Sequence, residues 1–306
     1  MNRHERIAFA TRRSLSKLTD DDRLALDYLN ARGFRAESKV WDDESVDWKE
    51  FHCVIIRSCW DYHLRPIEFL CWISRLECER VLLWNSPSVI RWNLEKTYLR
   101  DLEQKGITIA PTAWIEKSGT VNLSDVLETQ NWAKAVVKPT ISATGFQTFV
   151  TSPATAKKDQ SSLDNILLRS GAMVQQFVEQ ISTEGEWSFI FFNKEYSHAV
   201  LKRAKGGEFR VQQDFGGYLA NDVVPSDALI KQAQTIVDCV EEPLLYARVD
   251  GVEQDGALVL MELELIEPFL FFSSDFDSVV LFTNALKTIN EAKSSAADSR
   301  RLAAVT

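Results

Sequence analysis

The chain has 306 residues, enough for two domains or three small ones, and its 45% hydrophobic and 26% charged residues are typical of a protein with a sizeable core. A net charge of -9 argues against general nucleic-acid binding, which needs clustered lysine and arginine. The charged N-terminus and the lack of an apolar run of about 18 residues predict no signal peptide and no membrane contact, so we expect a cytoplasmic protein with five reduced cysteines and no zinc site.

The first ninety residues alternate strand and helix signals. Short apolar strands are predicted at residues 7–10, 54–56 and 81–84. Thr19 has the character of an N-cap for a helix that ends at Gly33, and Pro66 can open a second helix that reaches Glu79. This order predicts a small parallel sheet whose ligands lie at the carboxyl ends of its strands.

From Ser86 onward the predicted elements no longer alternate regularly between strand and helix. Ser86-Pro87 is predicted to open one long helix that ends at Gly106, and polar residues 154–163 are expected to be surface. Strands are predicted at residues 135–138, 147–151 and 173–178, helices at 227–241 and 274–290, and hairpins at 187–202 and 245–265. We expect residues 291–306 to form a disordered tail.

The most informative residues are three carboxylates near the C-terminus. Glu262 and Glu264 share one face of a predicted strand because side chains alternate with period two. A three-residue loop around Gly256 would set Asp250 opposite Glu262. Such charges repel unless a cation lies between them, and Mg²⁺ binds carboxylates together with nucleotide phosphates. A solvated polar face is the alternative, but Arg248 and Glu267-Pro268 frame the same site, and with the apolar flanks they favour a metal site.

Two basic segments complete the pattern. Lys138 ends an apolar strand and precedes a loop of small residues, which is typical of a phosphate site. Lys96 on the long helix is weaker evidence. Residues 202–217 carry four cations and two glycine pairs, which indicates a loop that closes over negative charge. A solvated hairpin end would explain the lysines but not Phe209 and Arg210.

These segments together resemble the ATP-grasp superfamily, in particular bacterial glutathione synthetases and the cycloserine-forming ligases, over about residues 86–290. The motifs that carry the resemblance are Asn93-Leu94-Glu95-Lys96, Lys138-Pro139, residues 173–178, Gly185-Glu186, residues 206–212, residues 248–250 and residues 262–268. The resemblance implies an α/β fold, α+β in its C-terminal half. Its parts would be an N-terminal parallel-sheet domain (1–111), a small central lid (112–178) and an antiparallel-sheet domain (179–290), with ATP and Mg²⁺ between the last two.

The resemblance also implies roles for individual residues. Those for the nucleotide are Lys96, Lys138, Thr144, Gly145, Gln176, Phe177, Val178 and Glu186. Lys202 and Arg210 would face the transferred phosphoryl group, and the magnesium ligands would be Asp250, Glu262 and Glu264. The chain departs from the family in two places. Glutathione synthetases have asparagine where Glu264 stands, and their glycine-rich phosphate loop is here residues 141–145, with one glycine.

The substrate end is predicted from Arg57, Ser58 and Asp61, which follow the strand at residues 54–56 in a stretch that also resembles the cycloserine-forming ligases. Arginine can bind a carboxylate bidentately and Asp61 can receive an ammonium group, which predicts an amino-acid-like substrate. The alternative is a structural Arg57–Asp61 ion pair.

The implied activity is that of a ligase that activates a carboxylate as an acyl phosphate and passes it to an amine, or closes a ring if the amine is intramolecular. Three alternatives remain open from sequence. One is a small-molecule kinase, and another is a non-catalytic nucleotide-binding regulator, which would not need Arg210. The third, a modifier of protein C-termini, would need a basic groove. A homodimer is also left open.

Overall fold

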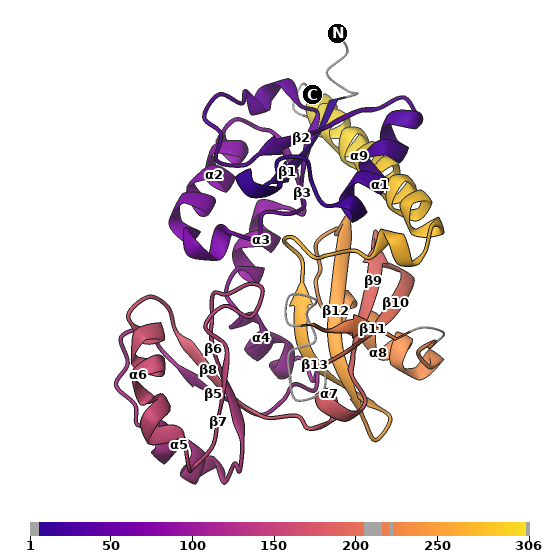
Figure 1. The fold of residues 1–306 in the computed structure, drawn as a ribbon. Helices are drawn as coiled ribbons and strands as arrows, with labels where there is room; N and C mark the ends of the chain where they lie inside the picture. Colours follow the sequence, from indigo (N-terminus) through magenta and orange to yellow (C-terminus); the bar gives the residue numbers. More distant parts are fainter. Residues whose placement is uncertain (1–5, 205–215, 221–222, 304–306) are drawn as a thin grey trace.

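The protein folds as three β-sheets with helices packed on them, in a computed structural model that describes residues 6–204, 216–220 and 223–303. Figure 1 shows the middle of the chain, with β5–β8, beside a larger body that combines the first and last thirds. None of the described helices has both the length and the apolar character of a membrane span.

The N-terminal sheet is parallel throughout, with strand order β2-β1-β3-β4, as the alternating signals predict. Thr19 caps its first helix by accepting a hydrogen bond from the Asp22 N–H. The edge strand β2 was not predicted, because its residues are mostly polar and only partly buried. The elements are β1 (Arg6–Thr11), α1 (Asp20–Ala31), β2 (Arg35–Val40), β3 (Cys53–Ile56), α2 (Pro66–Cys78) and β4 (Leu82–Trp84).

The predicted long helix after Ser86 is in fact two short helices, α3 (Pro87–Asn93) and α4 (Tyr98–Gln104). At the break the backbone N–H of Lys96 donates to the carbonyl of Thr140, 2.8 Å away, in the central domain. The Asn93 side chain bonds the backbone of Leu263 and Leu265. These tertiary contacts replace helical hydrogen bonds and turn Lys96 toward the interior.

The central sheet has strand order β5-β8-β6-β7 and its own apolar core, to which Leu123, Leu163 and Val174 belong. Residues 154–163, expected to be surface, are mostly exposed, and they lie largely within helix α6, whose apolar side faces this core. The elements are β5 (Thr112–Ile115), α5 (Leu123–Gln130), β6 (Ala135–Pro139), β7 (Phe149–Thr151), α6 (Ala156–Leu167) and β8 (Ala172–Gln176).

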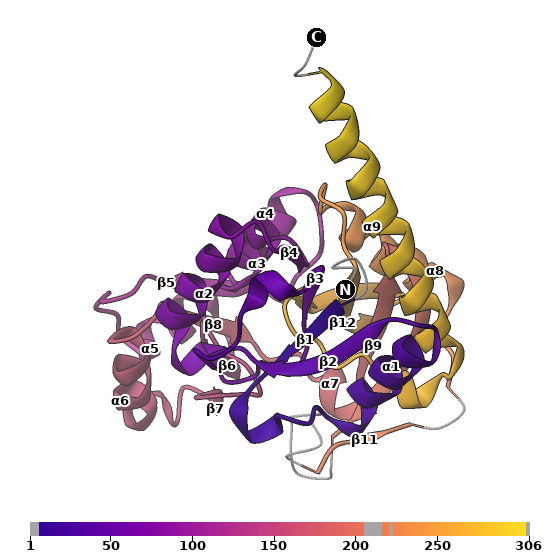
Figure 2. The same cartoon turned by 90° about the horizontal axis from the view of Figure 1, so that it is seen from above.

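The C-terminal sheet is antiparallel, with strand order β11-β10-β9-β12-β13. Its elements are α7 (Gln180–Thr183), β9 (Glu186–Phe192), β10 (Glu195–Arg203), β11 (Tyr218–Leu219), α8 (Asp227–Asp238), β12 (Tyr246–Gln254), β13 (Ala257–Glu264) and α9 (Asp277–Ala303). The disordered tail expected from residue 291 is wrong as far as Ala303, because α9 continues to that residue and extends beyond the body (Figure 2).

One hydrophobic core joins the N-terminal sheet to the C-terminal sheet. Phe9 of β1 and Phe192 of β9 both pack edge-on against Phe282 of α9. Phe192 also stacks on Phe272, with ring centroids 5.9 Å apart. These two sheets therefore form a single body, and the central sheet is built on a separate core.

Candidate active site

A cavity of about 470 Å³ lies between the central domain and the C-terminal sheet. Trp60 and Tyr62 of the N-terminal domain close one part of it. The predicted site residues that line it are Lys96, Lys138, Thr144, Gly145, Gln176, Phe177, Val178, Glu186, Lys202, Asp250, Glu262 and Glu264. Arg210 lies outside the described residues. Arg57, Ser58 and Asp61 are absent from the lining.

The predicted pairing of Asp250 with Glu262 is present, but by a different route. The hairpin turns through two residues, Asp255 and Gly256, both with positive φ, which is the geometry of a tight hairpin turn. Such a turn by itself would place Asp250 opposite Met261. A bulge next to Asp250 shifts the register by one residue, so that Glu262 faces it and the carboxylates gather on the cavity side.

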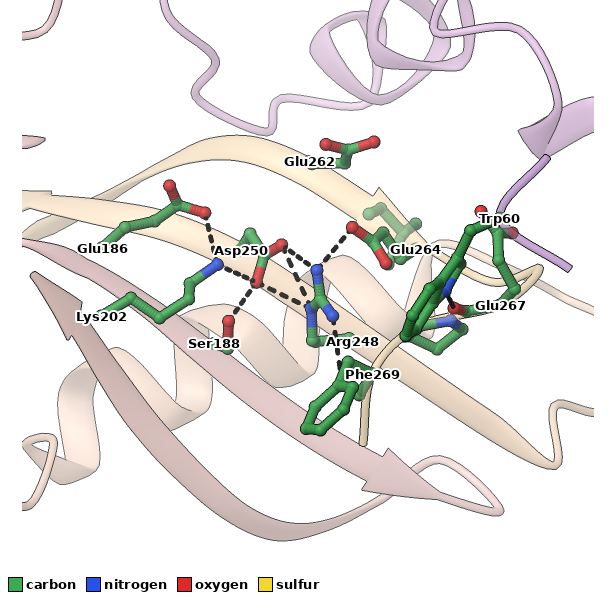
Figure 3. A network of polar contacts seen from close by, with 12 residues as sticks. Trp60, Glu186, Ser188, Lys202, Arg248, Asp250, Glu262, Glu264, Glu267 and Phe269 are labelled. Carbon is green, nitrogen blue, oxygen red and sulfur yellow. Dashed lines mark hydrogen bonds and ion pairs between the residues drawn. The ribbon is translucent and has the colours of Figure 1, made fainter. Parts of the chain in front are cut away.

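Asp250 is the centre of a buried ion network (Figure 3). Its carboxylate accepts hydrogen bonds from Arg248 at 2.8–3.2 Å and from the Ser188 hydroxyl, and it lies 3.3 Å from the Lys202 ammonium. Burial by itself would raise the pKa of Asp250, but Arg248 and Lys202 lower it to about 2. Lys202 also donates to Glu186 at 2.9 Å. Asp250 is therefore ionised and enclosed by cations.

The other two carboxylates of the cluster each have one cation. The Lys96 ammonium donates to Glu262 at 2.7 Å and to the Ser142 carbonyl at 2.9 Å. Arg248 contacts Glu264 at 2.5 Å. Burial raises the pKa of Glu264 to about 7, and the neighbouring Glu262 and Asp250 add to the rise that Arg248 opposes. The three carboxylates of the cluster therefore share three cations, Lys96, Lys202 and Arg248.

A divalent cation would fit this cluster chemically. Its donors are carboxylate oxygens, which Mg²⁺ prefers, and three of them come together on the cavity side of β12 and β13. Within the part of the chain that the structure describes, no three Asp, Glu, His or Cys side chains already converge as a metal site. For a divalent cation to bind here, Lys96 or Arg248 would therefore have to release its carboxylate and pair with another anion.

Lys138 differs from the other cations of the cavity. Its ammonium makes no hydrogen bond or ion pair with any described residue, and burial lowers its pKa to about 8, with Lys96 adding to the fall and Glu262 opposing it. The adjacent loop passes through positive φ at Thr144 and Gly145, whose backbone N–H groups also donate to no described residue. A free ammonium beside free N–H groups can bind a phosphate.

The predicted substrate residues next to β3 have structural partners instead. Arg57 is 1% exposed, bonds Asp22 at 2.9 Å and donates to the Pro268 carbonyl at 2.7 Å. Ser58 also bonds Asp22. Asp61 pairs with Arg65, not with Arg57. Direct substrate contact by these side chains is therefore wrong for this structure, and so is the expected Arg57–Asp61 pair.

The segment that follows β13, residues 265–270, pairs with no described strand, yet each of its six carbonyls accepts a side-chain hydrogen bond. The donors, in order from residue 265, are Asn85, Tyr246, Trp60, Arg57, Arg248 and His198, at distances of 2.7–3.1 Å. Buried carbonyls require such partners, and here they fix a backbone that has no regular structure. We call residues 265–270 the pinned segment.

Several lining residues were not assigned from sequence. Arg248 and Glu267 were seen only as residues that frame the carboxylates, and Phe269 and Phe271 were given no role. The aromatic residues that follow Glu267-Pro268 in the apolar run to Phe272 are the signal that could have extended the site in this direction.

The comparisons with known proteins agree with this geometry. Residues 7–85 match the family described as "D-cycloserine synthetase DcsG, N-terminal domain". The cycloserine biosynthesis protein DcsG of Streptomyces lavendulae is 30% identical over 302 residues, which cover 89% of this chain and 97% of that protein. A crystal structure of D-cycloserine synthetase DcsG superposes with a TM-score of 0.82 at 26% identity, covering 93% of this chain and 99% of that one.

A more distant match shows the fold alone. D-alanine–D-alanine ligase from Bacillus anthracis, complexed with ATP, superposes with a TM-score of 0.68 at 14% identity, covering 97% of this chain and 99% of that one. The fold, the cavity and these relatives define an ATP-grasp carboxylate–amine ligase, an ADP-forming enzyme that makes an amide bond. The chain belongs to the DcsG family. A kinase or a non-catalytic regulator is not favoured by these relatives.

Proposed function

We propose that this ligase uses ATP and Mg²⁺ to activate the carboxylate of an amino-acid-like substrate as an acyl phosphate and then closes it on an amine of the same molecule, giving a cyclic amide. The proposal draws on the DcsG relative, whose name refers to cycloserine biosynthesis. The observation that carries it is that Lys138, which pairs with no described residue, faces the carboxylates of β12 and β13 across one cavity. Because it needs ATP, we place the reaction in the cytoplasm.

The nucleotide is assigned to the central domain side of the cavity. Lys138, Thr144 and Gly145 would hold its phosphates, because their donors have no described partner. Phe177 and Val178 would read adenine through backbone groups. The Phe177 N–H donates to the Lys134 carbonyl at 3.1 Å, which holds this stretch of backbone in place. Gln176 completes this hinge.

The remaining polar residues are assigned to ribose, metal and phosphate. Glu186 would hold the ribose hydroxyls, and Lys96 would join Lys138 on the phosphates. Asp250, Glu262 and Glu264 would hold Mg²⁺, which when bound supplies positive charge to the triphosphate. Lys202 is assigned to the transferred phosphoryl group, and the same role for Arg210 stays a prediction.

The chemistry then needs no protein nucleophile. A substrate carboxylate oxygen attacks the γ-phosphorus and ADP leaves, which gives the acyl phosphate. The amine attacks the acyl carbon and loses a proton, and the carbon–oxygen bond to phosphate breaks. Lys96, Lys138 and Lys202 would offset the charge that moves during these steps, and the closed cavity would limit hydrolysis.

The test is a screen for ADP release over free amino acids, their side-chain amine derivatives and dipeptides, with products identified by mass. A product lighter than its single substrate by one water supports ring closure, and a product joined from two molecules supports an intermolecular ligase. Hydroxylamine should trap the acyl phosphate as a hydroxamate. An acid-stable phosphorylated product would instead identify a kinase.

A further inference from the structure

One carboxylate in the cavity has no partner among the residues that the structure describes. Five carboxylates line it, and Glu186, Asp250, Glu262 and Glu264 each pair with a lysine or an arginine. The fifth, Glu267, is 8% exposed, and its carboxyl group makes no hydrogen bond or ion pair with any described residue. Leaving a buried carboxylate without a partner is costly, so the position is unfavourable for folding alone.

The electrostatic surroundings of Glu267 favour a positive ligand. Burial raises the pKa of Glu267 well above its usual range, and Glu264 and Glu262 add to the rise, while Lys96 and Arg248 oppose it. Both of these cations already contact other carboxylates. A cationic group placed next to Glu267 would therefore meet a carboxylate for which no described cation competes.

The position of Glu267 is fixed with unusual strictness. It lies in the pinned segment, and its own carbonyl accepts from the Trp60 indole at 3.0 Å. The next two carbonyls, of Pro268 and Phe269, accept from Arg57 and Arg248 at 2.7 and 3.1 Å. Such support from neighbouring residues is what a preorganised binding residue requires.

Aromatic rings surround this end of the cavity. Trp60 and Phe269 are neighbours with ring centroids 6.3 Å apart, and Phe269 packs against Phe271 at 4.9 Å. Figure 3 shows Trp60 and Glu267 side by side at the edge of the ion network. A carboxylate among aromatic rings suits a compact ammonium group, since the rings exclude water and their faces attract cations.

We propose that Glu267 binds the ammonium group of the substrate and selects free amines over acylated or neutral ones. The inference rests on the proposed function only for the identity of the ligand as an amino-acid-like molecule. It gives Arg57, Trp60 and Arg248 a positioning role, because they hold the backbone on which Glu267 stands. The substrate carboxylate is then directed away from Glu267, toward the phosphate side of the cavity.

D-cycloserine, a cyclic amide with a primary amine, is the probe for this subsite. Its affinity should be measured by calorimetry on the full chain with saturating ADP and Mg²⁺, for the wild type, for Glu267→Gln and for Glu253→Gln as an exposed control on β12. We expect Glu267→Gln to weaken binding about 10- to 100-fold, as for loss of a charged hydrogen bond. Glu253→Gln should change nothing. N-acetyl-D-cycloserine should bind weakly and should not distinguish the three proteins.

Glutamine is nearly isosteric with glutamate, and Glu267 has no ion pair with a described residue that the change could remove. The variant should therefore fold, and unchanged ADP affinity will verify this. Equal affinity of the wild type and Glu267→Gln for D-cycloserine would overturn the inference, and so would failure of the wild type to bind it. ADP release is scored separately. Turnover with an unchanged KM in Glu267→Gln would leave the proposed function standing and remove the inference. An affinity for D-cycloserine that depends on Glu267, without ADP release from any substrate, would support the inference and contradict the proposed function.

Discussion

The carboxylate cluster of β12 and β13 and the pinned segment that follows it are neighbours in the chain, yet they are held in opposite ways. In the cluster, Asp250, Glu262 and Glu264 are held by ion pairs with cations that also line the cavity. In the pinned segment, six backbone carbonyls are held by side chains. Ion pairs can exchange partners when anions and metal arrive, whereas a pinned backbone stays in place. The ion pairs of the cluster can therefore rearrange during the reaction, whereas the backbone of the pinned segment is fixed.

The largest effect is expected from removing a carboxylate of the cluster. Glu262→Ala should lower turnover at least about 10³-fold, because a metal ion contributes several kcal/mol to such a reaction. The fold should persist, since the Glu262 side chain is 32% exposed and faces the cavity. Steady-state ADP release at varied Mg²⁺ measures the loss, with Glu253→Ala as the control. Full magnesium-dependent activity in Glu262→Ala would remove the metal assignment.

A change in the pinned segment should act on stability instead. Arg57→Lys keeps the charge but cannot contact Asp22 and the Pro268 carbonyl together, so the free energy of unfolding should fall by about 3 kcal/mol. Chemical denaturation measures this. Arg75→Lys, in an exposed pair with Glu79, should cost less than about 1 kcal/mol. ATP affinity should not change in either variant. A stable Arg57→Lys protein would contradict the fixed character of this region.

The pH dependence of ATP affinity should report on Lys138, which pairs with no described carboxylate. The pKa of the Lys138 ammonium is about 8 in the free protein. At higher pH the side chain is largely neutral, so ATP binding must be accompanied by uptake of a proton by Lys138. Affinity is therefore fully present below about pH 7 and should fall about tenfold between pH 7 and pH 9. Titrations with a non-hydrolysable ATP analogue measure it. In Lys138→Met the affinity should be lower throughout and this fall should be absent. The same fall in both proteins would assign it to another group.

The smallest effect concerns one hydroxyl. Tyr246 is fully buried, and its hydroxyl lies 2.8–3.1 Å from the carbonyls of Ile56, Trp84 and Ile266. Tyr246→Phe should lower the free energy of unfolding by about 1 kcal/mol, because the carbonyl that accepts the single hydroxyl proton is left without its donor. Thermal unfolding is the measurement, and Tyr28→Phe, which is only partly buried, is the control. Unchanged stability would show that the pinned segment does not depend on this contact.

The same comparison explains what could be predicted from sequence. Lys138 and the carboxylates of β12 and β13 were found because strand periodicity and local spacing place them, even though the register arises from a bulge and a two-residue turn. Arg57 was misassigned because Pro268 lies 211 residues further along the chain. The break between α3 and α4 was missed because its cause is a contact of Lys96 with Thr140.

The core that the N-terminal and C-terminal sheets share limits how this ligase can be recombined with its relatives. Helix α9 packs on α1, and Phe282 of α9 contacts Phe9 of β1. The two ends of the chain thus form one inseparable module, interrupted by a central domain with a core of its own. A chimaera that exchanges only residues 1–85 would inherit mismatched partners for this core and for the pinned segment. Exchange of the central domain between its two connections would leave both intact.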